Sequence, residues 1–140
     1  MRNPTFRGAH WYVCTVAGVA LLCIGWTAYR RVEEESLLRT HSGLMALLVA
    51  GDYERAYRLT TDEYRAAHTV GEFQSIFRDY EGDKSYLTQS PTVLSLGFFS
   101  AEVYAYEVRS LFEFLNGPSF FYRRERGRWR LTGKVVNYMD

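Results

Sequence analysis

The order of hydrophobic and polar residues divides the chain into an uncharged apolar stretch, a region with helical spacing and a region of alternating spacing. The apolar stretch, residues 11–29, reads WYVCTVAGVALLCIGWTAY and contains no charged residue. As a helix it would be about 28 Å long, which matches the hydrocarbon core of a bilayer. Aromatic residues at both of its ends are typical of positions at the lipid headgroups. We therefore predict a transmembrane anchor at residues 11–29, in contact with the lipid bilayer, after a short N-terminal tail at residues 1–10.

A cleaved signal peptide or a lipoprotein signal is the alternative explanation of an apolar N-terminal stretch. Signal cleavage requires small residues at the first and third positions before the cut, and Ala28 is preceded at that spacing by Trp26. A lipoprotein cysteine requires a small residue before it, whereas valine and leucine precede Cys14 and Cys23. An uncleaved anchor fits the sequence best.

The region after the anchor begins with a long helical pattern. Residues 32–50 place Leu37, His41, Leu44 and Leu48 at i, i+4, i+7 and i+11, which predicts a helix with one buried face. Because His41 lies on that face, we expect it to be a hydrogen-bonded residue of the core or of a pocket edge. No linker rich in proline, glycine or serine precedes this helix, so the domain that follows should lie near the bilayer.

Residues 51–80 contain the signals for three further short helices. Gly51 can end one helix in the left-handed conformation, and Asp52 can cap the next. Two Thr-x-x-Glu pairs have the spacing of a capping box and mark two more helix starts: Thr60 with Glu63, and Thr69 with Glu72. The last of these helices should extend from about Val70 to Tyr80.

Beyond Gly82 the hydrophobic period changes from helical to two, which predicts strands. The expected strands are residues 85–89, 92–99, 101–115 and 119–124, and a last one that contains Trp129, Leu131 and Val135. The dipeptide Arg126-Gly127 should form the tight turn of the last hairpin. In the long strand, alternation puts Tyr104 and Tyr106 on the face toward the helices and Val103 on the opposite face.

The motifs of the helical region resemble those of a known superfamily. A helix that ends in Gly-Asp-Tyr (51–53) is followed by Ala-Tyr (56–57), by Tyr-Arg (64–65) and by Thr69 with Glu-Phe (72–73), and a sheet comes after them. This order resembles the small cone-shaped domains of the nuclear transport factor two-like superfamily, over roughly residues 33–138. The likeness is best to bacterial members that are membrane-anchored or secreted and have no assigned function.

The resemblance implies an α+β fold for residues 32–140. About three to four helices would pack on a strongly bent, mostly antiparallel sheet and leave a cavity between the two. The motifs that carry the resemblance determine the fold, so they imply an architecture and not an activity.

Composition narrows the possible functions. A formal net charge of +1 argues against a chain built as a whole to bind nucleic acid or anionic lipid, so any charged site must be local. We expect no nucleic-acid partner. Both cysteines, Cys14 and Cys23, lie in the apolar stretch, so the domain after it has no internal disulfide, cysteine metal site or cysteine nucleophile. The three histidines lack metal-ligand spacing, and the sequence has no glycine-rich phosphate loop. We expect no cofactor and no metal.

The aromatic content of 16% is high, and it has two interpretations. The simpler one is a core of large rings; the other is a pocket for a small apolar ligand. The candidate pocket residues are Tyr57, Tyr64, Phe73, Phe77, Tyr104 and Tyr106. An enzyme would also need an acid or base at the cavity, but the possible groups, Asp62, His68, Glu102 and Glu107, are scattered, and no pair of them is fixed by spacing.

Basic residues cluster on the last hairpin, with only Glu125 among them. The candidate basic surface consists of Arg124, Arg126, Arg128, Arg130 and Lys134. It could bind anionic lipid headgroups, an acidic polymer or nucleic acid, or it could be only the solvated face of an edge hairpin. A second candidate surface is an exposed apolar strip of Val103, Leu111 and Phe121 on the sheet face away from the helices.

We therefore expect a single-pass membrane protein with a non-catalytic domain. The domain would bind a small apolar ligand in its cavity, or a protein partner or a second copy of itself at the cell envelope. The alternatives are acid/base catalysis in the cavity and lipid contact through the basic hairpin. The arginines on the two sides of the anchor slightly favour a cytoplasmic domain: Arg2 and Arg7 before it, Arg30, Arg31 and Arg39 after it. The family resemblance implies the opposite, a domain outside the cytoplasm.

Overall fold

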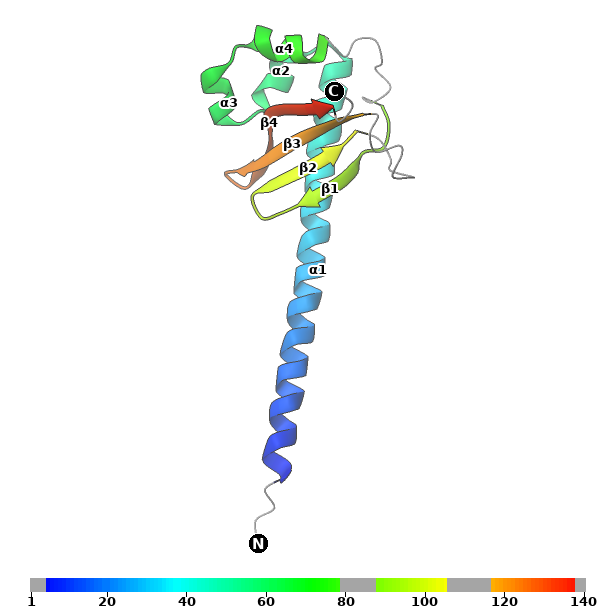
Figure 1. The fold of residues 1–140 in the computed structure, drawn as a ribbon, viewed down its shortest axis with the longest axis vertical. Coiled ribbons are helices and arrows are strands. Elements are labelled where there is room, and N and C mark those ends of the chain that lie inside the picture. Colours follow the sequence, from blue (N-terminus) through cyan, green and yellow to red (C-terminus); the bar gives the residue numbers. More distant parts are fainter. Residues whose placement is uncertain (1–4, 79–87, 106–116, 138–140) are drawn as a thin grey trace. The chain divides into compact units, whose positions relative to one another are not determined.

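The helices come first in the chain and the strands follow them (Figure 1). The computed structural model describes residues 5–78, 88–105 and 117–137, with side chains for 14–78, 88–105 and 117–136. The helices of this part are α1 (Thr5–Val49), α2 (Tyr53–Arg58), α3 (Asp62–Ala67) and α4 (Val70–Arg78). The strands are β1 (Thr92–Leu96), β2 (Ser100–Tyr104), β3 (Pro118–Glu125) and β4 (Arg128–Asn137). The fold class is α+β, as predicted.

The chain divides into two units, residues 1–33 and residues 34–140, and α1 contributes to both. In the first unit, large apolar side chains of α1 are exposed, among them Val16 at 68% and Leu22 at 75%. In the part of the chain that the structure describes, no helix combines the length and the apolar character needed to cross a membrane. The predicted anchor includes residues 11–13, whose side chains lie outside the described residues.

The second unit begins with the C-terminal part of α1, where the predicted buried face is confirmed. Leu37 and Leu44 have no exposed surface, and Leu48 and His41 are buried beside them. The three leucines belong to one hydrophobic core that also contains side chains from α4 and from the strands, such as Phe73 and Phe120. His41 is buried next to this core.

Two of the predicted helix signals are present as expected. Gly51 adopts a φ of 72° directly after α1, and the Asp52 carboxylate accepts a hydrogen bond from the Arg55 amide at 3.1 Å. Before α4, the Glu72 carboxylate accepts from the Thr69 amide at 2.7 Å, and the Glu72 amide donates to the Thr69 hydroxyl at 3.3 Å. This reciprocal pair is the predicted capping box.

The prediction for the start of α3 is wrong by one residue. Thr61, not Thr60, caps the helix and accepts from the Tyr64 amide at 3.2 Å. The Thr60 hydroxyl instead donates to the Tyr57 carbonyl at 2.7 Å. The reason is tertiary: Thr60 forms a parallel bridge with Leu131 of β4, and the Thr61 amide donates to the Leu131 carbonyl at 2.8 Å. Pairing with the sheet thus decides where the helix begins.

The four strands form one antiparallel sheet in the order β1-β2-β3-β4. The β3–β4 hairpin turns as predicted, with positive φ at Arg126 (50°) and Gly127 (76°), a pair typical of tight hairpin turns. Figure 1 shows β4 at the side of the sheet nearest α2 and α3. The register shifts once in each outer pair, between Val93 and Ser95 and between Phe120 and Tyr122.

The predicted strand 92–99 is too long, and the other two predicted strands before β3 are described only in part. Residues 85–87 lie outside the described part, and Thr88 and Gln89 lie in a turn and a bend, not in a strand. β1 ends at Leu96 because the Gly97 amide donates to the Ser100 carbonyl at 2.8 Å, which closes a tight turn into β2. The predicted strand 101–115 is described only to residue 105.

The predicted orientation of β2 is also wrong. Val103 has no exposed surface and belongs to the core cluster together with residues of α1 and α4, so it faces the helices. Its neighbour Tyr104 points to the other face, where it pairs across the sheet with Ser119, yet Tyr104 is fully buried as well. Because Tyr104 is buried although it lies on the face away from the helices, the position of a large ring does not identify the side that the helices cover.

We predict that Gly133→Ala will strongly destabilise the protein. Gly133 lies in β4 with a φ of 79°, and a Cβ atom there would lie 2.0 Å from Cε2 of Tyr64. Backbone strain and overpacking together should lower the free energy of unfolding by about 3 kcal/mol. The measurement is urea unfolding of the full chain in detergent, followed by circular dichroism.

Gly127→Ala is the matched control. Gly127 has nearly the same φ, 76°, but no atom lies within 4 Å of the position of an added Cβ. Only the backbone strain applies, so the free energy of unfolding should fall by about 1 kcal/mol. Equal losses for the two variants would show that the Tyr64 ring is not packed against Gly133.

Candidate functional site

Four of the six candidate pocket residues pack against one another. The ring centroids of Tyr57 and Phe73 lie 5.8 Å apart, those of Tyr64 and Phe73 6.2 Å apart, and those of Phe73 and Phe77 5.0 Å apart. Each pair is edge-to-face, the arrangement that aromatic rings prefer in protein cores. Phe73 is fully buried. These rings of α2, α3 and α4 fill the space between the helices with their own side chains.

The Tyr57 hydroxyl is engaged by the fold. It donates toward two carbonyls at the end of α3, His68 at 2.5 Å and Arg65 at 3.1 Å, and so joins α2 to α3. The remaining two candidates are not part of this cluster. Tyr104 is buried on the far face of the sheet, and Tyr106 lies outside the described residues.

The Tyr64 ring contacts both His68 and Gly133. The His68 imidazole stacks on it with centroids 4.3 Å apart and planes 9° apart, and Gly133 of β4 lies against Cε2 and Cδ2. Its hydroxyl is buried and has no hydrogen-bond partner among the described residues. Burial, followed by the nearby Glu72 and Tyr57, raises the pKa of the Tyr64 hydroxyl. His68 is thus occupied by this stack.

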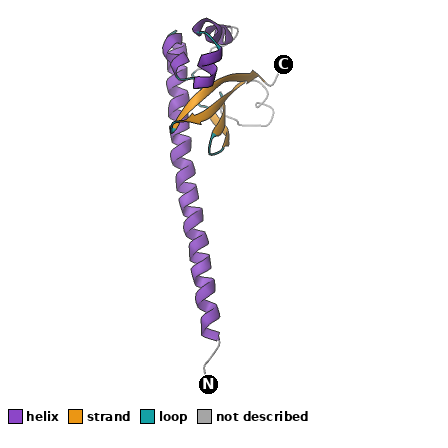
Figure 2. Ribbon diagram, turned by 90° about the vertical axis from the view of Figure 1, so that its left-hand side faces the viewer, coloured by secondary structure: helices purple, strands orange, loops and turns teal. Residues whose placement is uncertain are grey.

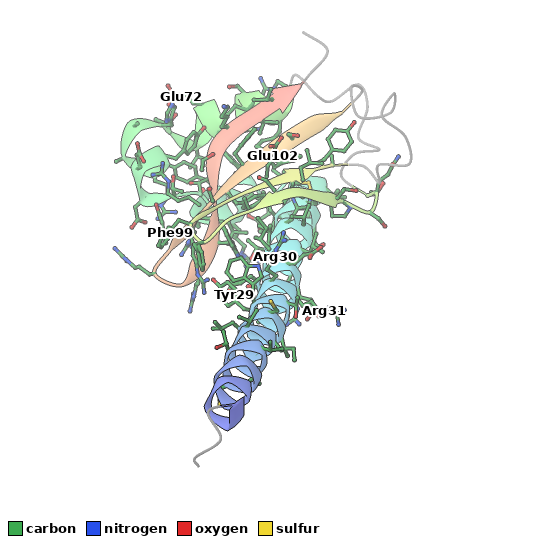
Figure 3. The ribbon with its side chains drawn as sticks, turned by 60° about the horizontal axis from the view of Figure 1, so that its bottom comes forward. Tyr29, Arg30, Arg31, Glu72, Phe99 and Glu102 are labelled. Carbon is green, nitrogen blue, oxygen red and sulfur yellow. The ribbon has the colours of Figure 1, made fainter. Side chains whose placement is uncertain are left out.

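The possible acid/base groups do not converge. Asp62 lines a depression of about 290 Å³ at the β3–β4 hairpin, whereas His68 lines a different one of about 210 Å³ beside Tyr64. Glu102, labelled in Figure 3, lies on β2, and Glu107 lies outside the described residues. Among the described side chains, no three histidine, cysteine or acidic residues are grouped to bind a metal.

The basic hairpin is joined to the acidic first turn of α3. The Arg126 guanidinium lies 3.2 Å from the Asp62 carboxylate, and the Arg123 guanidinium 2.6 Å from that of Glu63. Glu125, in turn, accepts a hydrogen bond from the Asp62 amide at 3.0 Å. Acidic residues are common in a first helical turn because they interact favourably with the helix dipole. The sequence therefore assigned Asp62 and Glu63 to the start of α3 and did not predict their ion pairs with the hairpin arginines.

The other candidate basic residues have different neighbours. The Arg130 guanidinium donates to the Arg58 carbonyl at 2.5 Å, and the Lys134 ammonium lies 4.6 Å above the centre of the Phe121 ring. The Arg128 side chain forms no ion pair or hydrogen bond with another described side chain. The 290 Å³ depression at the hairpin is lined by Asp62, Glu125, Arg126, Arg128 and Arg130. Three guanidinium groups and two carboxylates therefore surround it.

The predicted apolar strip is not formed at Val103. That side chain is buried, Phe121 is half-buried beneath Lys134, and Leu111 lies outside the described residues. Instead, Phe98 and Phe99 are exposed, at 55% and 75%. They form the β1–β2 turn, which sequence reasoning missed because it placed them in a continuous strand; Figure 3 labels Phe99 at this turn.

His41 is a core residue. Its Nδ1 lies 2.8 Å from the Tyr122 hydroxyl, and its ring meets the Phe120 ring edge-on at 5.1 Å. Burial lowers the pKa of His41 from 6.5 to about 4, so the imidazole is neutral at pH 7. The expectation of a hydrogen-bonded core residue is confirmed.

Comparison with known proteins gives no relative: no family model, curated protein or solved structure matches the chain.

We predict that acid will destabilise the fold through His41. The pKa of this group is about 4 when folded and about 6.5 when unfolded, so the unfolded chain binds the proton first as the pH falls. Stability is fully present above pH 6.5 and decreases between pH 6.5 and 4, by up to about 3 kcal/mol. Urea unfolding of the full chain at a series of pH values measures this loss.

His41→Gln removes the titration while keeping a polar side chain near Tyr122. The variant should be less stable at pH 7 but should lose less stability than the wild type between pH 6.5 and 4. Parallel curves for the two proteins would assign the acid sensitivity to other groups.

Proposed function

We propose that the chain is a single-pass membrane protein whose domain, residues 34–140, binds an anionic partner at the β3–β4 hairpin and is not an enzyme. Residues 11–29 would be the anchor. Support comes from the exposed apolar side chains of α1, such as Val19 and Ile24, since a helix that is apolar all round needs an apolar surrounding. The 19-residue length without a charge agrees with the thickness of a bilayer.

We also propose that the domain belongs to the nuclear transport factor two-like superfamily. Several features support this assignment: short helices precede the sheet, the four described strands pair antiparallel, and the register shifts in both outer pairs. Register shifts of this kind increase the twist and bend of a sheet, and the strands curve in the side view of Figure 2. A bent sheet is the part of the cone fold that these features favour.

One observation carries the binding proposal: Arg126, Arg128 and Arg130 line one depression of about 290 Å³. A guanidinium group offers five donors in a planar fork that matches carboxylate or phosphate oxygens. The ion pair of Arg126 with Asp62 is open to solvent, with side chains 89% and 54% exposed, and such pairs contribute little to stability. An incoming anion can therefore replace the carboxylate as the partner of Arg126.

The packed aromatic cluster makes a surface site preferable to the cavity site that the sequence suggested. A small apolar ligand among Tyr57, Tyr64, Phe73 and Phe77 would have to displace rings that already contact one another. Opening space in such a core costs several kcal/mol for each large side chain that moves. The hairpin depression requires no such rearrangement.

We predict that the full chain, in a neutral detergent, binds a soluble polyphosphate through these arginines. Arg128→Gln should weaken binding about fivefold, because one arginine contributes roughly 1 kcal/mol to contact with an anionic surface. Arg126→Gln should act in the same direction. Affinity measured by isothermal titration calorimetry should also fall as salt is added, since salt screens exposed charges.

Arg39→Gln is the control, because Arg39 is an exposed arginine in a similar ion pair, with Glu35 at 3.2 Å, but lies on α1. An equal loss of affinity in this variant would show that binding depends only on the net charge of the protein. The hairpin would then not be the binding site.

We further predict that protease added to sealed cells will digest the domain, because the family proposal places it outside the cytoplasm. The measurement is the size of the protected fragment before and after lysis. Protection of residues 34–140 until the cells are lysed would reverse the orientation and agree with the arginine count on the two sides of the anchor.

A further inference from the structure

The β1–β2 turn presents two large apolar rings to solvent on a well-fixed backbone. Phe98 and Phe99 are 55% and 75% exposed. The Gly97 amide donates to the Ser100 carbonyl at 2.8 Å, and the Arg124 amide of β3 donates to the Phe99 carbonyl at 2.8 Å. The second bond attaches the turn to the next hairpin. Adjacent exposed phenylalanine side chains on a fixed backbone are typical of an interaction site.

The sheet register brings these rings to the arginine end of the domain. Ser100, the first residue of β2, pairs with Arg123 of β3, and Arg123 pairs with Arg130 of β4. Both hairpin turns therefore lie at the same end of the sheet, and Figure 3 shows Phe99 there. Two aromatic and two basic residues, separate in sequence, are thus brought to one end of the sheet, which we call the aromatic–arginine edge: Phe98, Phe99, Arg126 and Arg128.

This combination fits a bilayer better than it fits a protein. A stable protein interface needs roughly 800 Å² from each partner around an apolar centre. Two rings at one turn supply only part of such a centre. The headgroup region of a bilayer imposes no such area, accepts aromatic rings at its boundary, and attracts basic residues when its lipids are anionic. The charge of Arg126 and Arg128 is complementary to that surface.

We propose that the aromatic–arginine edge docks on the surface of an anionic bilayer, with Phe98 and Phe99 entering the interface and Arg126 and Arg128 binding lipid phosphates. This inference rests on the proposed function, in which the same arginines bind an anion, and it names the partner as lipid. The anchor of the same chain holds the domain at a high effective concentration near a bilayer, so individually weak contacts suffice.

The test places a fluorescent reporter at the edge of the full chain. In a background with Trp11→Phe and Trp26→Phe, the buried Trp129 remains as a constant signal. Phe99→Trp adds the reporter, and the protein is reconstituted in nanodiscs of phosphatidylcholine and phosphatidylglycerol with brominated acyl chains, which quench nearby indole rings. The expected result is quenching of the introduced tryptophan.

Quenching should disappear in nanodiscs of phosphatidylcholine alone, in high salt, and in the Arg126→Gln/Arg128→Gln variant. Val49→Trp, in the same background, is the matched control, since Val49 is also 55% exposed in residues 34–140 but lies on α1. The control reporter should not be quenched. An unquenched reporter at position 99 in anionic discs, or equal quenching in neutral discs, would overturn the proposal.

Polyphosphate binding by the same proteins separates the two proposals. If polyphosphate binds and the reporter is not quenched, the proposal that the arginines bind an anion stands, and only the assignment of lipid as the partner fails. If neither occurs, both proposals fail. Phe98→Ser/Phe99→Ser should leave polyphosphate affinity unchanged, which shows that the domain is folded; a loss of that affinity would contradict a purely lipid role of the rings.

Discussion

The attachment of the short helices to β4 is the contact on which the second unit depends. The segment between α2 and α3 extends the sheet by one bridge at Thr60 and Leu131, and the Thr61 amide binds the Leu131 carbonyl. Two residues after Leu131 in β4, the Tyr64 ring occupies the space that a side chain on Gly133 would need. Backbone pairing and the absence of a side chain thus fix α3 against the strand, and α3 then carries Tyr64 into the core.

The same attachment determines the chemistry of the hairpin surface. Because α3 begins beside the end of β3, its first acidic residues meet arginines of the hairpin, and Glu125 meets the Asp62 amide. The hairpin is therefore not a continuous positive surface. It is a set of alternating charges around a depression, in which an exposed carboxylate competes with any incoming anion. Such competition would make the proposed anion binding depend on ionic strength and on the charge of the anion.

Sequence patterns predicted features that depend on neighbouring residues and missed those that depend on contacts distant in sequence. The Thr69–Glu72 capping box and the tight turn at Gly127 need only local chemistry, and both are present. The start of α3 shifted because a strand far along the chain paired with Thr60. The prediction of which face of β2 points toward the helices failed, because alternation separates two faces but does not identify the one that the helices cover. Among the candidate sites, the arginines were found from their clustering along the last hairpin, whereas Phe98 and Phe99 were assigned to a continuous strand and so were not recognised as exposed.

The packed interior explains why function is better sought at the surface of this domain. A domain of this size has a small net stability, about 5–15 kcal/mol, and removing one large core side chain costs about 3–5 kcal/mol. Tyr64, Phe73 and Phe77 each contact other rings, so a change that opened a ligand cavity among them would use much of that stability. Phe99 lies on the β1–β2 turn and Arg128 at the start of β4, and both side chains are exposed. Because they contribute little to the core, selection can act on them at little cost to folding. These constraints on a small domain with a filled core favour the proposed binding at the end of its sheet.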